Sequence, residues 1–468
     1  MIKSINHINT LNIRLLILIG AALLFIPFLG GVHLFDWDEI NFAESAREML
    51  VTGDYLTVQI NFQPFWEKPP LFIWMQVISM KIFGINEFAA RFPNAICGIV
   101  TLLIIFNIGR KIRNNLFGLL WVMAYAGSVL PFFYFKSGII DPWFNLFIFL
   151  GVYYLMLYAY PENHQKFKNV ALSAVFTGLA VLTKGPVGFL LVAITGGIFL
   201  LWIKFRVRVK ATEVLVFFIV FALIGGSWFI MQIVSGHSDT VVEFLVYQVR
   251  LFQTQDAGHG GFFGYHFIVL LIGVFPSSVL ALKAFRKEPG NEAFYRLMKI
   301  WMVILFWVVL ILFSIVKTKI IHYSSLAYFP LTFLAATFVY QAYLKQIKWS
   351  RWISVTIISL SVLLALPVLL LQFVEKFKYR IIDANLINDA FTTENLKAEV
   401  NWSGFEFLPG VFFLLAVFYI FGMIKKEFPL KRAFSLWTVN MLFILSVVLI
   451  LVPKIEKYSQ NALIEFFK

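Results

Sequence analysis

Apolar residues occur in long continuous runs along almost the whole chain, and short polar segments separate them. The runs do not alternate between apolar and polar positions, so they predict membrane-spanning helices rather than the strands of a barrel. We expect an all-α polytopic membrane protein with about thirteen transmembrane helices, each close to the twenty or so residues that cross a bilayer. Their approximate ranges are 13–32, 88–108, 116–135, 142–160, 169–183, 186–203, 214–233, 265–283, 298–316, 323–343, 352–373, 407–424 and 433–452.

Two further stretches between the first and second predicted spans also have helical spacing. In "EINFAESAREML", apolar side chains recur at Ile40, Ala43 and Ala46, and "PPLFIWMQVISMKIFG" has a higher apolar content. Both patterns predict short amphipathic helices that lie along a membrane surface. The first span itself lacks a small-residue cleavage site, so we expect it to be retained.

The composition supports a membrane protein. Of 468 residues, 60% are hydrophobic and 14% are charged, and a soluble chain of this length would need more polar surface. The single cysteine, Cys97, excludes an internal disulfide and a cysteine metal cluster.

The net charge is +14, and the basic residues are unevenly divided between the two predicted sides of the membrane. With the N-terminus placed in the cytoplasm, most of the 39 lysine and arginine residues fall in the N-terminal segment and six short inner loops. The positive-inside rule supports this orientation, which puts the loops 33–87, 234–264 and 374–406 outside. Orientation and anionic lipids explain the basic charge, so we expect membrane lipids and no nucleic acid as partners.

The outer loops contain acids that orientation does not explain. "FDWDEINFAESAREML" carries Asp36, Asp38 and Glu39, and charges beside hydrocarbon are costly unless they have a function or water. Asp38 is either a helix N-cap or a general base for an acceptor hydroxyl. Asp141 precedes Pro142, which suits an N-cap and does not exclude a second acidic role.

Cationic and aromatic residues occupy the same side. Lys68 follows Glu67 in "FQPFWEKPPLFIW", as a solvated ion pair or as an anion ligand. "SIVKTKIIHYSSLAYFP" offers an anion pocket or a snorkelling group at interface depth. Its polar residues are Lys317, Lys319, His322 and Tyr323.

A glycine-rich outer stretch, "VEFLVYQVRLFQTQDAGHGGFFGYH", carries Arg250, Asp256 and His259. It either closes over a substrate or merely connects two spans. Glu67 with His237 or His259 could hold a divalent metal, although no ligand spacing demands one and we expect no required cofactor.

Acids for a base and cations for a phosphate on one side fit a lipid-phosphate-linked sugar. The cations would stabilise the leaving phosphate, and a carboxylate would activate the acceptor hydroxyl.

Five motifs carry a resemblance to a known family: "DEINFAESAREML", "FWEKPPLFIW", "FAARFPN", "LTKGP" and "KTKIIHYSSLAYFP". Over roughly residues 13–335 the chain resembles the dolichyl-phosphate-mannose protein mannosyltransferase superfamily, and within it the bacterial aminoarabinose lipid A transferases. The resemblance implies the GT-C fold, a polyprenyl-phosphate sugar donor and inversion at the anomeric carbon.

The resemblance also assigns residues. Asp38 matches the family's essential aspartate, Lys68 matches its lipid-phosphate lysine, and Asp141 resembles a second acid. Arg250 in "QVRLF" falls where the family has an arginine, in a looser match, and Tyr323 in "KIIHY" matches the tyrosine of a family motif. The C-terminal third departs from the aminoarabinose enzymes, which have a sizeable outer domain there, so lipid A does not follow as the acceptor.

We therefore predict an inverting glycosyltransferase of the bacterial plasma membrane, with its site on the periplasmic side and a lipid, glycan or protein acceptor. Residues 1–343 form the catalytic module, and residues 344–468 form C-terminal membrane helices with a short outer loop. The catalytic acids are Asp38, Glu39 and Asp141. The donor phosphate ligands are Lys68, Arg250, Lys317, Lys319, His322 and Tyr323.

Two other functions compete with this prediction. A transporter or flippase would need polar or broken helices at mid-membrane depth in both halves, whereas the polar groups here gather on one side. A non-catalytic envelope-assembly subunit would lack turnover.

Overall fold

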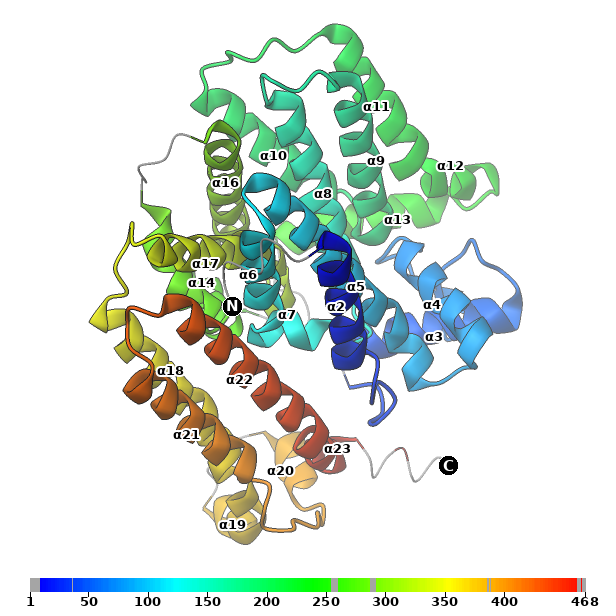
Figure 1. The fold of residues 1–468 in the computed structure, drawn as a ribbon. Helices are drawn as coiled ribbons and strands as arrows, with labels where there is room; N and C mark the ends of the chain where they lie inside the picture. Colours follow the sequence, from blue (N-terminus) through cyan, green and yellow to red (C-terminus); the bar gives the residue numbers. More distant parts are fainter. Residues whose placement is uncertain are drawn as a thin grey trace.

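The computed structural model describes residues 9–35, 37–253, 260–286, 292–384, 387, 389–460 and 464, and these residues are almost entirely helical (Figure 1). Among them, the strands are one short antiparallel hairpin, β1 (Gln59–Ile60) and β2 (Gln63–Pro64). The predicted helical fold class is confirmed.

The α-helices are α2 (Thr10–Phe25), α3 (Trp37–Thr52), α4 (Leu71–Phe83), α5 (Glu87–Ile112), α6 (Asn115–Ala126), α7 (Val129–Tyr134), α8 (Asp141–Ala159), α9 (Lys166–Lys184), α10 (Val187–Trp202), α11 (Ala211–Gly225), α12 (Ser227–Val234), α13 (Ser238–Gln253), α14 (Tyr265–Gly273), α15 (Ser277–Ala281), α16 (Ala293–Ile315), α17 (Tyr328–Tyr343), α18 (Arg351–Leu370), α19 (Gln372–Asp383), α20 (Ala390–Leu396), α21 (Leu408–Met423), α22 (Pro429–Ile450) and α23 (Val452–Ser459). The 3₁₀ helices are η1 (Leu282–Phe285) and η2 (Ile321–Ala327).

Every predicted span contains helix, but the count of thirteen is not confirmed. Within the described residues, five helices are long and apolar enough to cross a membrane, or up to seven if two bent pairs are counted. The pairs are α11 with α12, bent by 54°, and α14 with the segment Ser277–Phe285, bent by 106°. Several other apolar runs form helices of fewer than eighteen residues. Hydropathy cannot detect such breaks, because an apolar run reads the same whether its backbone is straight or bent.

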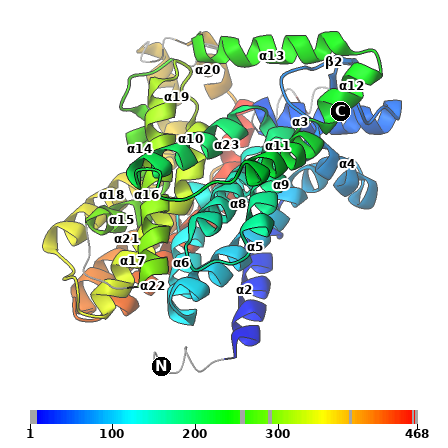
Figure 2. The ribbon, with the colours of Figure 1, turned by 90° about the horizontal axis from the view of Figure 1, so that it is seen from above.

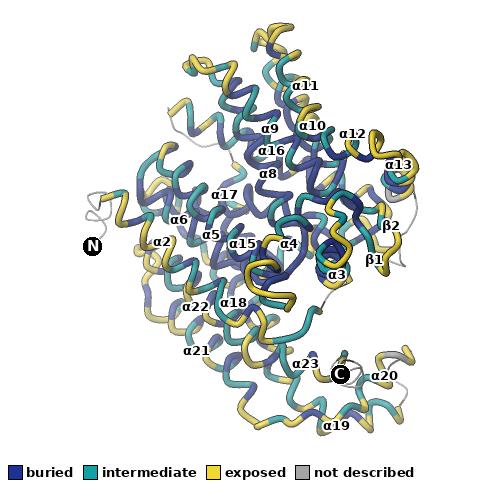
Figure 3. Tube along the Cα trace, turned by 90° about the vertical axis from the view of Figure 1, so that its right-hand side faces the viewer, coloured by how far each residue is buried: buried dark blue, intermediate teal, exposed yellow. Residues whose placement is uncertain are grey.

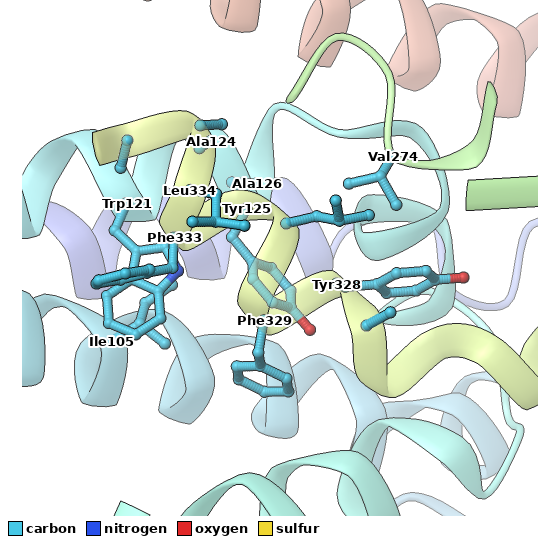
Figure 4. Packing of buried hydrophobic residues seen from close by; sticks show 14 of the residues in the cluster. Ile105, Trp121, Ala124, Tyr125, Ala126, Val274, Tyr328, Phe329, Phe333 and Leu334 are labelled. Atoms are coloured by element: carbon cyan, nitrogen blue, oxygen red, sulfur yellow. The ribbon is translucent and has the colours of Figure 1, made fainter. Parts of the chain in front are cut away.

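Aromatic side chains interlock the central helices (Figure 4). Trp121 of α6 packs against Phe333 of α17 with ring centroids 5.1 Å apart, and its indole N–H donates to Thr332 Oγ1 at 3.1 Å. Phe329 stacks on Phe149 of α8 at 4.3 Å. Each such pair adds about 0.5–1.5 kcal/mol to the burial of its area. Figure 3 shows that buried residues concentrate in this central part.

The first predicted outer loop folds back onto the bundle. Helices α3 and α4 were both predicted, and both form. The apolar face of α3, with Ala43, Ala46 and Met49, is buried in a small core shared with Ile73 and Val77 of α4. This face therefore packs on protein, which the amphipathic pattern alone does not distinguish from packing on lipid.

The predicted outer loops gather at one end of the bundle. In Figure 2, α3, α13 and α20 lie toward the upper edge and α2 begins at the opposite edge. Helix α12 is fastened to the first loop, because Trp228 Nε1 and Gln232 Nε2 both donate to the Leu56 carbonyl at 2.9 Å. In the C-terminal part, Gln460, which directly follows α23, also contacts this loop, because its Nε2 donates to Leu34 O at 2.8 Å.

Candidate functional site

Two of the predicted acids, Asp38 and Asp141, face the same histidine. His322 Nε2 lies 3.6 Å from Asp38 Oδ2 and 3.9 Å from Asp141 Oδ2. Asp141 is 2% exposed and His322 is 8% exposed, while the Asp38 side chain is 22% exposed. We call Asp38 and Asp141 the acid pair. Asp38 is therefore the acid of the pair that a hydroxyl from solvent can reach.

The fold brings the acid pair together through Glu39. Its two carboxylate oxygens accept hydrogen bonds from Arg91 Nε at 2.7 Å and Nη2 at 2.8 Å. They also accept the backbone N–H of Phe35 at 2.8 Å and that of Gly138 at 2.5 Å. Because Gly138 lies three residues before Asp141, Glu39 ties the Asp38 helix to the segment that begins α8. Glu39 was predicted among the catalytic acids; its contacts are those of a positioning residue.

Arg91 completes this junction. Besides Glu39, it donates to the carbonyls of Leu29, Val32 and His33 at 2.7–2.8 Å. Arg91 is 4% exposed, and a buried guanidinium needs this degree of pairing to be tolerated. The segment after α2, the start of α3 and the segment before α8 therefore meet at the Glu39–Arg91 pair.

Neither acid acts as a simple helix N-cap. Helix α3 begins at Trp37, so Asp38 is inside its first turn. Helix α8 begins at Asp141 itself, its N-cap residue is Ile140, and no side-chain cap bond forms there. Asp141 Oδ1 instead accepts from Lys184 Nζ at 2.7 Å, at the end of α9. Asp141 Oδ2 is buried and has no hydrogen-bond partner.

Two predicted phosphate ligands, Lys68 and Arg250, meet at one aromatic ring and form what we call the cation pair. Lys68 Nζ lies 5.5 Å from the ring centroid of Tyr247 of α13, and the Arg250 guanidinium lies 5.2 Å from it. The Tyr247 hydroxyl donates to Glu67 Oε2 at 3.0 Å. Glu67 Oε2 is 3.6 Å from Lys68 Nζ, so the ion pair considered in the sequence is also present.

Helix α13 connects the cation pair to the acid pair. Phe244 lies one turn before Tyr247, and its ring packs on Gly185, where a Cβ would stand 2.7 Å from Phe244 Cζ. Gly185 has φ +100°, a backbone conformation that favours glycine. Gly185 directly follows Lys184, whose ammonium binds Asp141 and lies 5.5 Å from the Tyr323 ring.

Lys319, another predicted phosphate ligand, points toward the end of α16. Lys319 Nζ donates to the carbonyls of Phe313, Ser314 and Val316 at 2.9, 2.7 and 2.5 Å, where it caps α16. All three ammonium hydrogens are thus engaged, and burial lowers the Lys319 pKa. Lys319 is therefore directed at the end of α16, and its role as a phosphate ligand stays a prediction.

His322 faces carboxylates, and its role as a phosphate ligand stays a prediction. Lys317 is exposed and Tyr323 is half-buried, so both stay predictions. Asp36, Asp256 and His259 lie outside the described residues. In the described part of the chain, no group of three or more histidine, cysteine or acidic residues is placed to hold a metal.

Sequence reasoning missed Arg91, Lys184 and Tyr247 as members of the site. Arg91 stands in "FAARFPN" and Lys184 in "LTKGP", so each motif was visible, but neither showed which acid its cation would meet. Tyr247 had no signal beyond its position in an outer helix.

These features define a class: a helical membrane protein whose acids and cations are gathered at one end of the bundle. Residues 67–230 match the family model described as dolichyl-phosphate-mannose-protein mannosyltransferase. An uncharacterised Aquifex aeolicus protein is 28% identical over 78% of this chain and 70% of its own length. The undecaprenyl phosphate-alpha-4-amino-4-deoxy-L-arabinose arabinosyl transferase of Pectobacterium carotovorum is 26% identical over 69% of this chain and 58% of its own length. The chain thus spans less than two thirds of that relative.

The fold has a counterpart among solved structures. ArnT from Cupriavidus metallidurans bound to undecaprenyl phosphate superposes with a TM-score of 0.74 at 18% identity, over 97% of this chain and 79% of that one. At this identity the likeness to the solved structure is one of fold alone.

Proposed function

We propose that this protein is an inverting glycosyltransferase that moves a sugar from a polyprenyl-phosphate donor, undecaprenyl phosphate in particular, to an acceptor hydroxyl or phosphate. The main support for the proposal is that the acid pair and the cation pair lie at the same end of the bundle. Helix α13 and Lys184 connect the two pairs. The names of the relatives support the same donor class.

Asp38 is the candidate general base. It is the more exposed member of the acid pair, so an acceptor hydroxyl can approach it. As the hydroxyl oxygen bonds to the anomeric carbon, its proton passes to Asp38 and the bond from that carbon to the phosphate oxygen breaks. A single displacement of this kind inverts the anomeric centre. Asp141, fixed by Lys184, lines the site and places the substrate.

Lys68 and Arg250 are the candidate ligands of the leaving phosphate. Charge on the phosphate oxygens increases as the sugar departs, and cations already in place stabilise that charge. Lys68 is 9% exposed, and its contact with Tyr247 restrains it without consuming its hydrogen-bond donors. Lys317 and Tyr323 are further candidates from the neighbouring turn.

We place the site on the periplasmic face of a bacterial plasma membrane, with the N-terminus in the cytoplasm and residues 1–343 as the catalytic module. The basic inner loops support this orientation. We further propose that the acceptor is lipid A, another glycan or a protein.

The proposal is tested by turnover. Purified protein in nanodiscs is incubated with a panel of synthetic undecaprenyl-phosphate pentoses and hexoses and with lipid A, oligosaccharide and peptide acceptors. Mass spectrometry should detect released undecaprenyl phosphate together with a glycosylated acceptor. Failure to consume any donor, in protein that still unfolds cooperatively on heating, would contradict the proposal. Envelope glycolipids, glycans and glycoproteins compared with and without the protein then identify the native acceptor.

A further inference from the structure

His322 lies between the two carboxylates of the acid pair, which is not the position expected of a residue that binds phosphate. Its Nε2 is within 4.0 Å of a carboxylate oxygen from each member of the acid pair. These are ion-pair distances, longer than the hydrogen bonds that such groups form when aligned. In enzymes without bound substrate such contacts are often long and shorten on binding.

The backbone at His322 is fixed by the helix that carries Asp141. Asn145 of α8 donates through Nδ2 to Ser325 Oγ at 2.7 Å, and the Ser325 hydroxyl donates to the His322 carbonyl. Asn145 lies one helical turn after Asp141, on the same face. Both Asn145 and Ser325 are buried, so α8 sets the position of the histidine and of one acid together.

A cation between the two acids would offset their repulsion. Lys184 pairs with Asp141 through Oδ1, and Asp141 Oδ2 is buried and without a hydrogen bond. His322 Nε2 lies within 4.0 Å of a carboxylate oxygen of each acid, so a positive charge there attracts both carboxylates.

We propose that His322, as an imidazolium, is a positioning residue that bridges Asp38 and Asp141, offsets the repulsion between the two carboxylates and orients Asp38 toward the acceptor. This proposal rests on the function proposed above. His322 acts through Asp38 and does not touch the reacting atoms.

Within the described residues, ionisable groups near His322 come from several elements. They are Asp38 of α3, Asp141 of α8, Lys184 of α9, His266 of α14, and Tyr323 and Lys319 of its own segment. Of these described groups the first two are acids, so loss of the imidazolium charge should act on the acid pair.

Two variants test whether the positive charge at position 322 matters. His322→Asn removes the charge, and His322→Lys keeps a positive charge on a different side chain. Removal of the charge should lower kcat about 10²-fold, the loss typical of a misplaced reacting group, with little change in KM for the donor. Lysine should restore part of the rate. It should also move the alkaline limb of the pH–rate profile upward, because lysine ordinarily titrates about four pH units above histidine.

His266 offers a matched control. It is fully buried, and its Nδ1 is 3.1 Å from Ser324 Oγ in the same turn, with no acid recorded beside it. His266→Gln should therefore leave the alkaline limb where it is in the parent. Parent-like kcat in His322→Asn, or an unmoved limb in His322→Lys, would overturn the proposal.

A double-mutant cycle tests the bridge without turnover. Thermal unfolding is measured in detergent for His322→Asn, Asp141→Asn and the double variant, and again with Asp38→Asn. If His322 bridges the acids, the effects on Tm should be clearly less than additive, whereas His266→Gln with Asp141→Asn should be additive. Additive effects for both His322 pairs would refute the bridge. If the parent consumes no undecaprenyl-phosphate sugar but the cycle shows coupling, the proposed function fails and the bridge stands.

Discussion

At the scale of single residues, Asp38 is the most direct test of the chemistry. Asp38→Asn keeps the size of the side chain and removes its basicity. Since general-base catalysis contributes typically about 10²–10⁴-fold, transfer should fall by at least about that factor while expression and donor binding survive. The measurement is turnover of a polyprenyl-phosphate sugar in nanodiscs.

Asp54 supplies the control for this variant. It lies in the same outer loop, and its Oδ1 accepts the backbone N–H groups of Leu56 at 2.9 Å and Thr57 at 3.1 Å. Asparagine can make the same turn, so Asp54→Asn should keep near-parent turnover. Near-parent turnover by Asp38→Asn as well would remove Asp38 from the mechanism.

The cation pair is tested by lipid binding. Lys68→Ala or Arg250→Ala should weaken polyprenyl phosphate binding by about 1.5–3 kcal/mol for each charged hydrogen bond lost. Binding of polyprenyl alcohol, which has no phosphate, should be unchanged in the same detergent. Lys81 is a matched lysine of the first loop, 4.5 Å from the Tyr55 ring, and Lys81→Ala should affect neither lipid. Equal loss for both lipids would mean that Lys68 and Arg250 support the fold.

At the scale of elements, the Arg91–Glu39 junction should dominate the stability of the first outer loop. Arg91→Met leaves Glu39 buried without its partner, and such a change typically costs about 3–5 kcal/mol. We expect a lower Tm and faster proteolysis within residues 33–87. The partly exposed Arg47–Glu44 pair of α3 is the comparison, because a solvated pair of this kind contributes little and Arg47→Met should cost only about 0–1 kcal/mol. Similar losses from both variants would contradict the assigned role of Arg91.

The C-terminal outer segment should be sensitive to acid through Glu406. Burial alone would raise the Glu406 pKa, but hydrogen bonds from the backbone N–H groups of Ser403 and Glu406, with those from the Ser403 and Lys454 side chains, outweigh it and lower the pKa to about 2. A lowered carboxylate pKa stabilises the fold above the ordinary value of 4.5, and this stabilisation is lost as the pH falls toward 2.

The lowered pKa of Glu406 stabilises the folded state by on the order of 3 kcal/mol. Trp402 reports on the same segment, since its indole N–H donates to the Tyr458 hydroxyl at 3.0 Å. Its fluorescence should therefore change between pH 4.5 and 2 in the parent. Glu406→Gln should remove most of this pH dependence, and an unchanged transition in that variant would assign it to another group.

At the scale of the whole molecule, the orientation in the membrane is open to direct labelling. Asn61 is exposed in the turn of the β1–β2 hairpin, and Cys97 is buried and can be replaced by alanine. A cysteine at Asn61 should react with an impermeant thiol reagent in intact spheroplasts. A cysteine at Glu162, exposed in a predicted inner loop, should react only after permeabilisation. The reverse pattern would invert the proposed topology.

Much of the site could be predicted because charged side chains beside apolar runs are conspicuous. Asp38, Asp141, Lys68 and Arg250 were selected for that reason and are found in two connected groups. Lys319 was selected by the same signal, but its ammonium caps a helix. A lysine near a helix end has the same sequence signature whether it points to a ligand or back to carbonyl groups, since only the fold fixes the direction of its side chain.

The sequence by itself determined that this chain is a helical membrane protein, where its helical segments lie, and which of its loops carry acids and cations. These properties depend on the transfer of apolar groups from water and on helical spacing. Both are set by residues that are close together in the sequence. Only the tertiary structure decided where the helices break, that Glu39 and Arg91 join three segments, and that His322 faces two carboxylates. Those features depend on contacts between residues 52 to more than 180 positions apart, and no local pattern records which distant partner a buried charge will meet.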